Sequence, residues 1–379
     1  MDNSLNLNAM KLYVLLSTLI VIASCQKSND PPPVNDKPQR LTIEGKNIKT
    51  PDGNVIELRG VNWGWWETAQ PQDATEAVAM GARVVRMPFR WYFGGDGSNI
   101  RQTDAPGHIK PEGLQLLDQY INWCTEQKIW VLLFAGSDQG AGDSTENYWT
   151  NASLKKEFIE TWEFLVQRYK NKPYIAAYEL LSEPHPKKPV TNQQVVSFYE
   201  DVISAIRKHD TLTPLMIGPN DHYDINLLEE SITTKDKKII YTFNYYLPTD
   251  YIKPDKREQA GLPIVSYPGS YNDFNGNAVN LNKDYLTQIL QPAVQFRNKY
   301  NVPVFVNQMG ARSRCPNNVS YLTDVCDIFY QYQIPFTYWT YRTNSDQSEY
   351  GIYWFNKTTN QYVFKPEPAA VLSAAFKRK

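Results

Sequence analysis

The chain has 379 residues, of which 42% are hydrophobic, and its 39 basic and 40 acidic residues give a formal net charge of -1. This apolar content is enough for a sizeable core, which excludes a disordered chain, and the length allows one large domain or two ordinary ones. The balanced charge provides no basic surface for nucleic acid and no polybasic patch for a membrane. The 10 Trp and 25 Tyr residues indicate extensive ring packing, and such rings can also stack on the apolar faces of sugars.

The amino-terminal segment has the features of an export signal followed by a tether. The apolar run 12–23 follows Lys11 and is too short to span a bilayer as a helix. The sequence Ile22-Ala-Ser-Cys25 resembles a bacterial lipobox, which implies cleavage before Cys25 and attachment of lipid to this cysteine. Residues 1–24 are therefore predicted to be a lipoprotein signal peptide. Residues 25–40, rich in proline and polar side chains, are predicted to be the lipidated cysteine and a flexible tether.

The body of the chain, residues 41–379, is predicted to be one domain in which strands alternate with helices. It begins with a short hairpin, whose strands 41–45 and 54–58 lie on either side of the turn signal Pro51-Asp-Gly53. Helical patterns are clear at 154–169, 193–209 and 284–300. Eight strands are predicted, at 55–63, 82–89, 129–135, 175–181, 214–218, 238–246, 303–309 and 335–341.

Eight strands that alternate with helices, without a break in composition, favour a single (β/α)8 TIM barrel of the α/β class, with the hairpin closing its amino-terminal face. A doubly wound open sheet is the alternative, but no Gly-rich phosphate turn follows the first strand. Two connections are unusually long and aromatic, at 247–283 and 343–364. A loop as long as the first is usually functional or mobile, whereas the second either packs on its own rings or contacts a ligand.

The cysteines and histidines do not have the spacing of a metal site. Cys315 and Cys326 are candidates for a disulfide in an exported protein, and they are either bridged or free. Cys124 lies in a helical pattern and is predicted to be a buried thiol. The four histidines are scattered along the chain, so the sequence indicates neither a metal nor another cofactor.

The ends of the predicted strands carry the residues suited to chemistry. The run 174–185 stops at Glu183-Pro184, and because proline cannot donate to a sheet ladder, Glu183 is predicted at the carboxyl end of the fourth barrel strand, where barrels place their active sites. Glu179 lies inside the same strand. Other polar and aromatic residues are predicted at strand ends: Trp63, Trp65, Trp66, Arg86, Trp91, Ser182, Asn244, Tyr246, Gln308 and Trp339.

Several of these segments resemble glycoside hydrolase family 5, the cellulase and mannanase type of barrel. The similar segments cover almost the whole body: Leu58-Arg-Gly-Val-Asn62, Gly81-Ala-Arg-Val-Val-Arg-Met-Pro88, Tyr178-Glu-Leu-Leu-Ser-Glu-Pro184, Phe243-Asn-Tyr-Tyr246, Pro303-Val-Phe-Val-Asn-Gln-Met-Gly310 and Tyr338-Trp339. The resemblance implies a polysaccharide or oligosaccharide ligand and an acid role for Glu183. It also implies substrate contacts from the following residues: Arg86, Trp63, Trp65, Ser182, Asn244, Tyr246 and Trp339.

The chain departs from the family pattern at the nucleophile. A retaining glycosidase needs a second carboxylate about 5 Å from the acid. At that place the sequence reads Asn307-Gln308-Met309-Gly310, and a neutral amide is a poor nucleophile. Ser182 and Asn244 replace the Asn and His that the family usually has, and no His ends the third strand. A single substitution made to trap a substrate would not explain these other departures.

Two functions follow from this pattern, and a third is a scaffold with a vestigial site. The first is a pseudoenzyme that binds a β-linked polysaccharide without hydrolysing it, because Gln308 replaces the nucleophile. The alternative is an active endo-β-glycosidase that uses Glu183 as the acid with a relocated second carboxylate, for which Asp138, Asp346 and Glu349 are candidates. The lipid anchor at Cys25 implies a cell-envelope location, with the outer membrane as the expected address and surface exposure as an open question.

Overall fold

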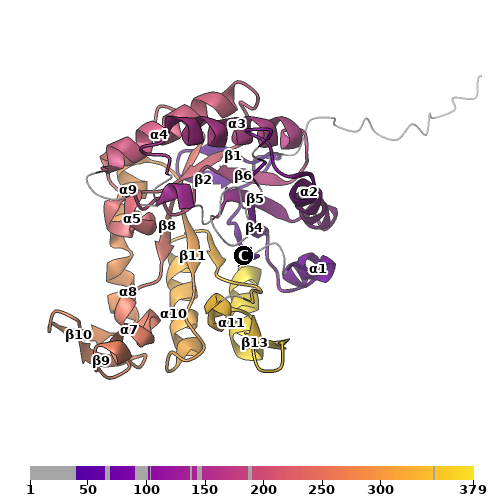
Figure 1. Ribbon diagram of the computed structural model, residues 1–379. Coiled ribbons are helices and arrows are strands. Elements are labelled where there is room, and N and C mark those ends of the chain that lie inside the picture. Colours follow the sequence, from indigo (N-terminus) through magenta and orange to yellow (C-terminus); the bar gives the residue numbers. More distant parts are fainter. Residues whose placement is uncertain are drawn as a thin grey trace, which may run out of the picture. The chain divides into compact units, whose positions relative to one another are not determined.

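Eight parallel strands close into a barrel in the order β11-β12-β3-β4-β5-β6-β7-β8, which confirms the predicted (β/α)8 fold (Figure 1). The computed structural model describes residues 40–64, 69–89, 101–102, 104–136, 139–142, 147–186, 190–344 and 346–379. Each predicted strand contains one observed strand: β3 (Arg59–Asn62), β4 (Val84–Phe89), β5 (Trp130–Ala135), β6 (Ile175–Glu179), β7 (Leu215–Ile217), β8 (Ile239–Tyr245), β11 (Val304–Met309) and β12 (Phe336–Tyr338).

The helices lie around the outside of this barrel (Figure 1). The long ones are α1 (Pro71–Ala79), α2 (Pro111–Glu126), α3 (Ala152–Tyr169), α4 (Asn192–Arg207), α8 (Lys283–Ile289), α9 (Gln291–Tyr300), α10 (Asn318–Gln331) and α11 (Pro366–Lys377). The apolar face predicted for α3 is buried along its whole length. No helix in the described ranges has the length and apolar character needed to cross a membrane.

One helix prediction was wrong. The pattern at 284–300 predicts a single helix, but the structure has α8 and α9, which are separated at Leu290. Pro292 in the first turn of α9 explains the interruption, because proline has no N–H for a helical hydrogen bond and its ring clashes with the preceding turn.

The amino-terminal hairpin is present, but its second strand was predicted in the wrong place. β1 (Thr42–Glu44) pairs with β2 (Asn47–Lys49), so the turn of this hairpin falls at Gly45, whose φ of 56° suits glycine. The predicted turn at Pro51-Asp-Gly53 also forms, and after it Val55 makes a single antiparallel bridge with Lys49. Ile48 of the hairpin is buried in the same apolar cluster as Met216 of β7 and Phe305 of β11. The hairpin therefore closes the amino-terminal end of the barrel, as expected.

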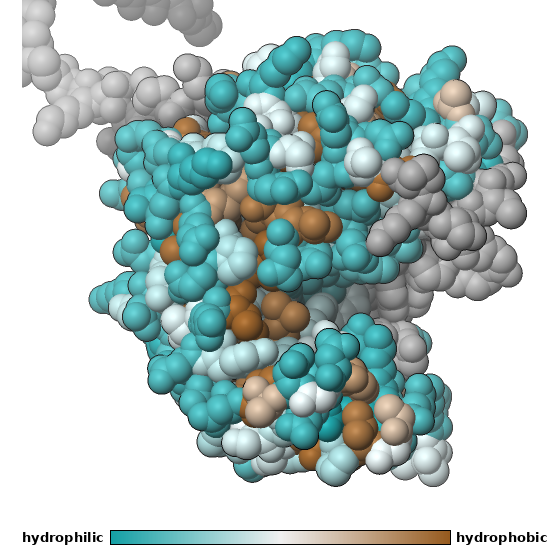
Figure 2. Space-filling view, turned by 90° about the vertical axis from the view of Figure 1, so that its left-hand side faces the viewer, coloured by the Kyte–Doolittle hydropathy of each residue, from teal (hydrophilic) through white to brown (hydrophobic). Residues whose placement is uncertain are grey.

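The segment 247–283 folds into short elements of its own: α6 (Thr249–Ile252), α7 (Pro254–Gln259), β9 (Gly269–Asn272) and β10 (Ala278–Leu281). Tyr251 and Tyr267 are buried and pack on Tyr321 of α10, with ring centroids 4.9 and 5.5 Å away. These rings therefore fix the segment to the barrel. Figure 2 faces this side of the molecule. It shows hydrophobic residues gathered in a hollow above the lobe that lies lowest in the view.

The segment 343–364 contains the hairpin of β13 (Tyr353–Asn356) and β14 (Gln361–Phe364). Tyr353 and Phe364 contact each other across the two strands, with centroids 5.2 Å apart. The hairpin thus packs on its own rings, one of the two possibilities that the sequence leaves open.

The candidate disulfide between Cys315 and Cys326 is not formed, because both thiols are free. The Sγ atom of Cys315 lies against the carbonyl oxygen of Tyr251, 3.3 Å away, whereas Cys326 is buried within α10. Burial raises the pKa of each of these thiols to about 12. Cys124 is buried in α2, as predicted.

Candidate active site

Glu183 lies just beyond the carboxyl end of β6, four residues after the strand ends at Glu179. Its backbone has a φ of 53°, in the left-handed region that non-glycine residues seldom adopt. Its side chain is 28% exposed. Asn244 donates from Nδ2 to Oε1 of Glu183 at 2.6 Å, and Nδ1 of His222 lies 3.9 Å from Oε2. The carboxylate is therefore held from two sides while part of it still faces solvent.

Glu179 is fully buried and forms the centre of a hydrogen-bond network beneath the site. Arg86, which is also fully buried, donates from Nε and Nη2 to the two carboxylate oxygens of Glu179, each at 2.7 Å. The same guanidinium donates to Ser182 Oγ and to Asn62 Oδ1, both at 2.8 Å. Asn307 Nδ2 donates to Glu179 Oε1 at 2.7 Å. Arg86 and Ser182 thus support the floor of the site from below.

Gln308 lies near the end of β11, and its side chain is close to that of Tyr246. The phenol of Tyr246 donates to Oε1 of Gln308 at 2.9 Å. Gln308 is also the register partner of Asn244 in the parallel pair β11–β8. The side chain of Asn244 thus binds Glu183, and the backbone of Asn244 lies opposite Gln308 in the sheet. One residue of β8 therefore links the acid position to the nucleophile position.

The protonation states at the site suit binding better than acid catalysis. Burial opposes ionisation of Glu183, but contacts with His222, Asn244 and the charge of Arg86 outweigh it and leave the pKa of Glu183 below its ordinary value of 4.5. A general acid must hold a proton at the working pH. Burial raises the pKa of Tyr246 well above 10, so its phenol stays a hydrogen-bond donor.

The two predicted tryptophan contacts that the structure describes, Trp339 and Trp63, are both buried. Trp339 follows β12 and is 6% exposed. Trp63 is only 3% exposed and its ring meets Tyr120 edge-on, with centroids 6.2 Å apart, so it packs in the core and offers little ring face to a sugar. The other predicted tryptophans, Trp65, Trp66 and Trp91, lie outside the described residues, as does the predicted lipidation site Cys25.

Of the three candidates for a relocated second carboxylate, Glu349 is the one whose side chain the structure describes. Asp138 lies outside the described residues, and Asp346 begins the 3₁₀ helix Asp346–Tyr350. Glu349 lies in the same helix, and its Oε2 is 3.6 Å from Nε of Arg314 and 4.0 Å from Nε of Arg312. The Glu349 carboxylate therefore forms ion pairs with two arginines.

The sequence analysis missed His185 and His222. Their rings stack with centroids 4.1 Å apart and an interplanar angle of 17°, and His185 donates from Nδ1 to the carbonyl oxygen of Glu183 at 2.6 Å. Their places in the sequence could have indicated them as site residues, because His185 comes two residues after Glu183 and His222 follows the carboxyl end of the fifth barrel strand. In the described part of the chain, no group of three or more His, Cys, Asp or Glu side chains is arranged to hold a metal ion.

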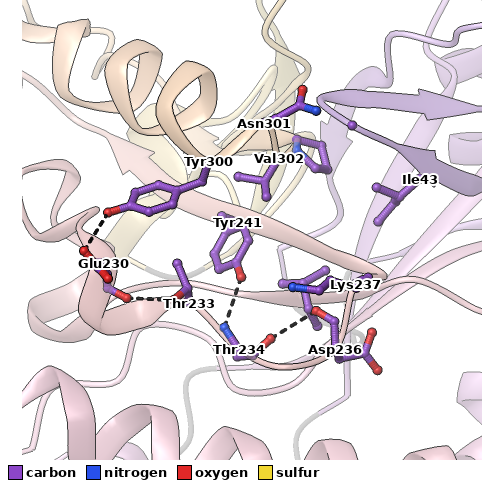
Figure 3. A pocket seen from close by; sticks show the side chains of 13 residues that line it. Ile43, Glu230, Thr233, Thr234, Asp236, Lys237, Tyr241, Tyr300, Asn301 and Val302 are labelled. Atoms are coloured by element: carbon purple, nitrogen blue, oxygen red, sulfur yellow. Dashed lines mark hydrogen bonds between the residues drawn. The ribbon is translucent and has the colours of Figure 1, made fainter.

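A separate pocket of about 510 Å³ lies at the opposite end of the barrel (Figure 3). It is lined by Tyr241 near the start of β8, by Pro303 just before β11, and by Ile43 of the hairpin. Inside it, the hydroxyl of Tyr300 donates to Oε2 of Glu230 at 3.5 Å. Because it is formed at the amino-terminal ends of the strands, this pocket does not belong to the site around Glu183.

This chain has the features of a glycoside hydrolase barrel: the closed barrel itself, a carboxylate at the end of the fourth strand and polar residues around it. The family model for cellulase (glycosyl hydrolase family 5) matches residues 48–345. The chain therefore belongs to glycoside hydrolase family 5.

Characterised relatives are moderately similar in sequence. Endoglucanase C of Acetivibrio thermocellus is 25% identical over 320 residues, which cover 75% of this chain and 90% of that protein. Endoglucanase 3 of Fibrobacter succinogenes is 28% identical over 339 residues, covering 77% of this chain and 50% of that protein. Both are described as endoglucanases, which agrees with a polysaccharide-related barrel.

Solved structures share the fold. The cellulose synthase subunit Z of Clostridioides difficile has a TM-score of 0.65 and 21% identity, with 85% of this chain and 100% of that chain covered. Cel5A of Thermotoga maritima, solved in complex with cellobiose, has a TM-score of 0.64 and 18% identity, with 85% and 97% covered. At these identities the likeness supports the barrel fold alone.

Proposed function

We propose that this protein is a pseudoenzyme that binds a β-linked polysaccharide and does not hydrolyse it. The observation that carries the proposal is the pairing of Tyr246 with an amide at position 308, because the Tyr246 hydroxyl donates to Gln308 where the family pattern has a nucleophilic carboxylate. An amide has no negative charge with which to stabilise an oxocarbenium ion and is a poor nucleophile. Without this group, a bound glycan stays intact.

The remaining groups are suited to sugar hydroxyls. Glu183, ionised and partly exposed, is an acceptor for hydrogen bonds from hydroxyl groups. Gln308 and Asn244 each carry both donor and acceptor atoms, and the buried Oδ1 of Asn244 has no hydrogen-bond partner among the residues that the structure describes. A buried acceptor without a partner costs free energy, which a hydroxyl of a bound sugar would recover. This combination of polar groups supports ligand binding.

The test follows binding and cleavage in the same samples. Protein lacking residues 1–25 is incubated with β-mannan, β-glucan, xylan and xyloglucan, and both gel retardation and new reducing ends are measured. We expect retardation by at least one glycan and no increase in reducing ends. Turnover that is abolished by Glu183→Ala would contradict the proposal and favour the active enzyme with a relocated carboxylate.

Glu183→Gln is expected to weaken glycan binding about tenfold or more, because hydrogen bonds to a charged acceptor contribute about 1.5–3 kcal/mol. Affinity gel electrophoresis with the retarding glycan measures the change. Glu163→Gln is the matched control, since Glu163 lies on α3 outside the barrel, near His209. Equal binding by wild type and Glu183→Gln would remove Glu183 from the ligand contacts.

We also propose that the protein is a lipoprotein of the cell envelope, anchored through Cys25 at the outer membrane. The support is the lipobox-like sequence and the tether that follows it. Cells expressing the full chain and fed radiolabelled palmitate are expected to yield a labelled, membrane-bound protein. Cys25→Ser should abolish both the label and the membrane association, whereas Cys124→Ser should change neither. An unlabelled wild-type protein would disprove the anchor.

A further inference from the structure

Three consecutive residues after β7 have left-handed backbone conformations. Asp221, His222 and Tyr223 have φ angles of 56°, 60° and 64°. None of them is glycine, and for such residues this region costs of order 1 kcal/mol or more each, so the surrounding structure must impose it. Conformations of this kind cluster at functional sites.

The surroundings hold this turn from several directions. The amide of Asp221 donates to Oδ1 of Asn220 at 2.7 Å, and the amide of His222 donates to the carbonyl oxygen of Pro184 at 3.2 Å. Asn244 donates from Nδ2 to the carbonyl oxygen of His222 at 3.1 Å. The same Nδ2 also donates to Glu183, so a single amide group fixes the turn and the carboxylate together.

Tyr223 anchors the other end of the turn in the barrel core. It is fully buried, and its hydroxyl lies 2.5 Å from the carbonyl oxygen of Leu181, to which it donates, and 3.2 Å from Oε1 of Glu179. Its ring also lies directly against Gly218, where a Cβ atom would be only 2.4 Å from the ring. The buried network around Glu179 therefore positions the loop that carries His222.

His222, which follows β7, therefore lies beside Glu183, which follows β6. His222 is 56% exposed, its ring stacks on His185, and its Nδ1 lies 3.9 Å from Oε2 of Glu183. The charged and titratable groups that act on it are Glu183 and His185 after β6, Asp221 on its own turn, and Lys253 at the end of α6. Glu183 is the nearest carboxylate among them.

We infer that His222 is a positioning residue for Glu183: its ring, stacked on His185, lies beside the carboxylate and orients it toward the ligand, so that glycan binding depends on pH. The part that concerns glycan rests on the proposed function. The pairing of His222 with Glu183 is a property of the protein itself and can be tested without any glycan.

The direction of the pH dependence follows from the pair. The neighbouring carboxylate of Glu183 raises the pKa of His222 above its ordinary value of 6.5, whereas the pKa of Glu183 is below its ordinary value of 4.5. The contribution of His222 is therefore complete below pH 6.5 and is lost as the pH rises through its raised pKa. The contribution of Glu183 is complete above pH 4.5 and is lost as the pH falls through its lowered pKa. Both groups are charged between these two limits.

The first experiment measures the pKa of each histidine by NMR in the full-length chain labelled with [13C]histidine. The chain has only four histidines, and loss of one signal in His222→Gln assigns His222. We expect the pKa of His222 to be above 6.5 in the wild type and to fall toward 6.5 in Glu183→Gln. His209, whose neighbour Glu163 at 3.5 Å is the same in both proteins, provides an internal control whose NMR signal should not differ between them. An unchanged pKa of His222 in Glu183→Gln would overturn the inference.

The second experiment measures the affinity for the retarding glycan between pH 5.5 and 9. The wild type is expected to bind about threefold more weakly at the high end, a modest change because exposed ion pairs contribute little. His222→Gln should bind weakly at every pH, and His209→Gln should follow the wild-type profile. A pH-dependent His222→Gln variant would contradict the positioning role. If no glycan binds at any pH, the proposed function fails while the NMR result still decides the pairing.

Discussion

Gln308→Glu is expected to give the protein glycoside hydrolase activity, at least about a hundredfold above the wild-type background. The new carboxylate would receive the hydrogen bond that Tyr246 now donates to Gln308, and it would supply the missing nucleophile. Its negative charge would also raise the pKa of Glu183, which favours the protonated form that a general acid needs. A single positioned catalytic group commonly contributes 10²-fold or more. Release of reducing ends from the retarding glycan measures the gain.

Two variants control this experiment. Gln308→Met keeps a neutral side chain of similar length and should remain inactive, and combining Gln308→Glu with Glu183→Gln should remove the gained activity. A folded Gln308→Glu protein that binds glycan but never cleaves it would show that position 308 does not alone explain the loss of hydrolysis. Ser182 and Asn244, which also depart from the family pattern, would then be the next positions to substitute.

Glu179→Ala is expected to destabilise the protein by about 3–5 kcal/mol, the largest stability effect predicted for a single site in this network. Arg86 and Glu179 are both fully buried, so removing the carboxylate leaves the guanidinium charge without its partner in the core. Asn307 would lose an acceptor at the same time. Unfolding in urea, followed by tryptophan fluorescence, measures the change in the free energy of unfolding.

The matched control is an exposed pair. Lys156 and Glu160 are 3.6 Å apart on α3, with 77% and 39% of their side chains exposed. Lys156→Ala should change stability by less than about 0.5 kcal/mol, because surface ion pairs are screened by water and salt. If Glu179→Ala cost no more than this control, the buried network would not be the support of the site.

The sequence predicted the barrel well because its signals are local. Each parallel strand, buried on both faces, appears as a short apolar run, and the helical pattern predicted at 154–169 corresponds to α3, whose apolar face is buried. Local patterns failed where two signals competed. Gly45 and Pro51-Asp-Gly53 both indicate a turn and both form one, but the paired strands of the hairpin lie on either side of the first.

The site was predicted in part, for a similar reason. Residues at strand ends, such as Glu183, Asn244 and Gln308, are brought together because the carboxyl ends of parallel strands meet at one edge. The role of Glu179 could not be predicted, since its partners Arg86 and Asn307 come from two other strands, β4 and β11, and become neighbours only when the barrel closes. His222 depends on a left-handed turn of three non-glycine residues, for which the sequence has no local signal.

The central claim is that the wild-type protein holds a glycan and leaves it intact. The most direct test titrates the protein with a β-linked hexasaccharide of the retarding glycan in a calorimeter, keeps the mixture for a day and then measures the mass of the recovered sugar. The account predicts saturable binding and recovery of the intact hexasaccharide. Appearance of shorter oligosaccharides in the wild type, but not in Glu183→Gln, would contradict it.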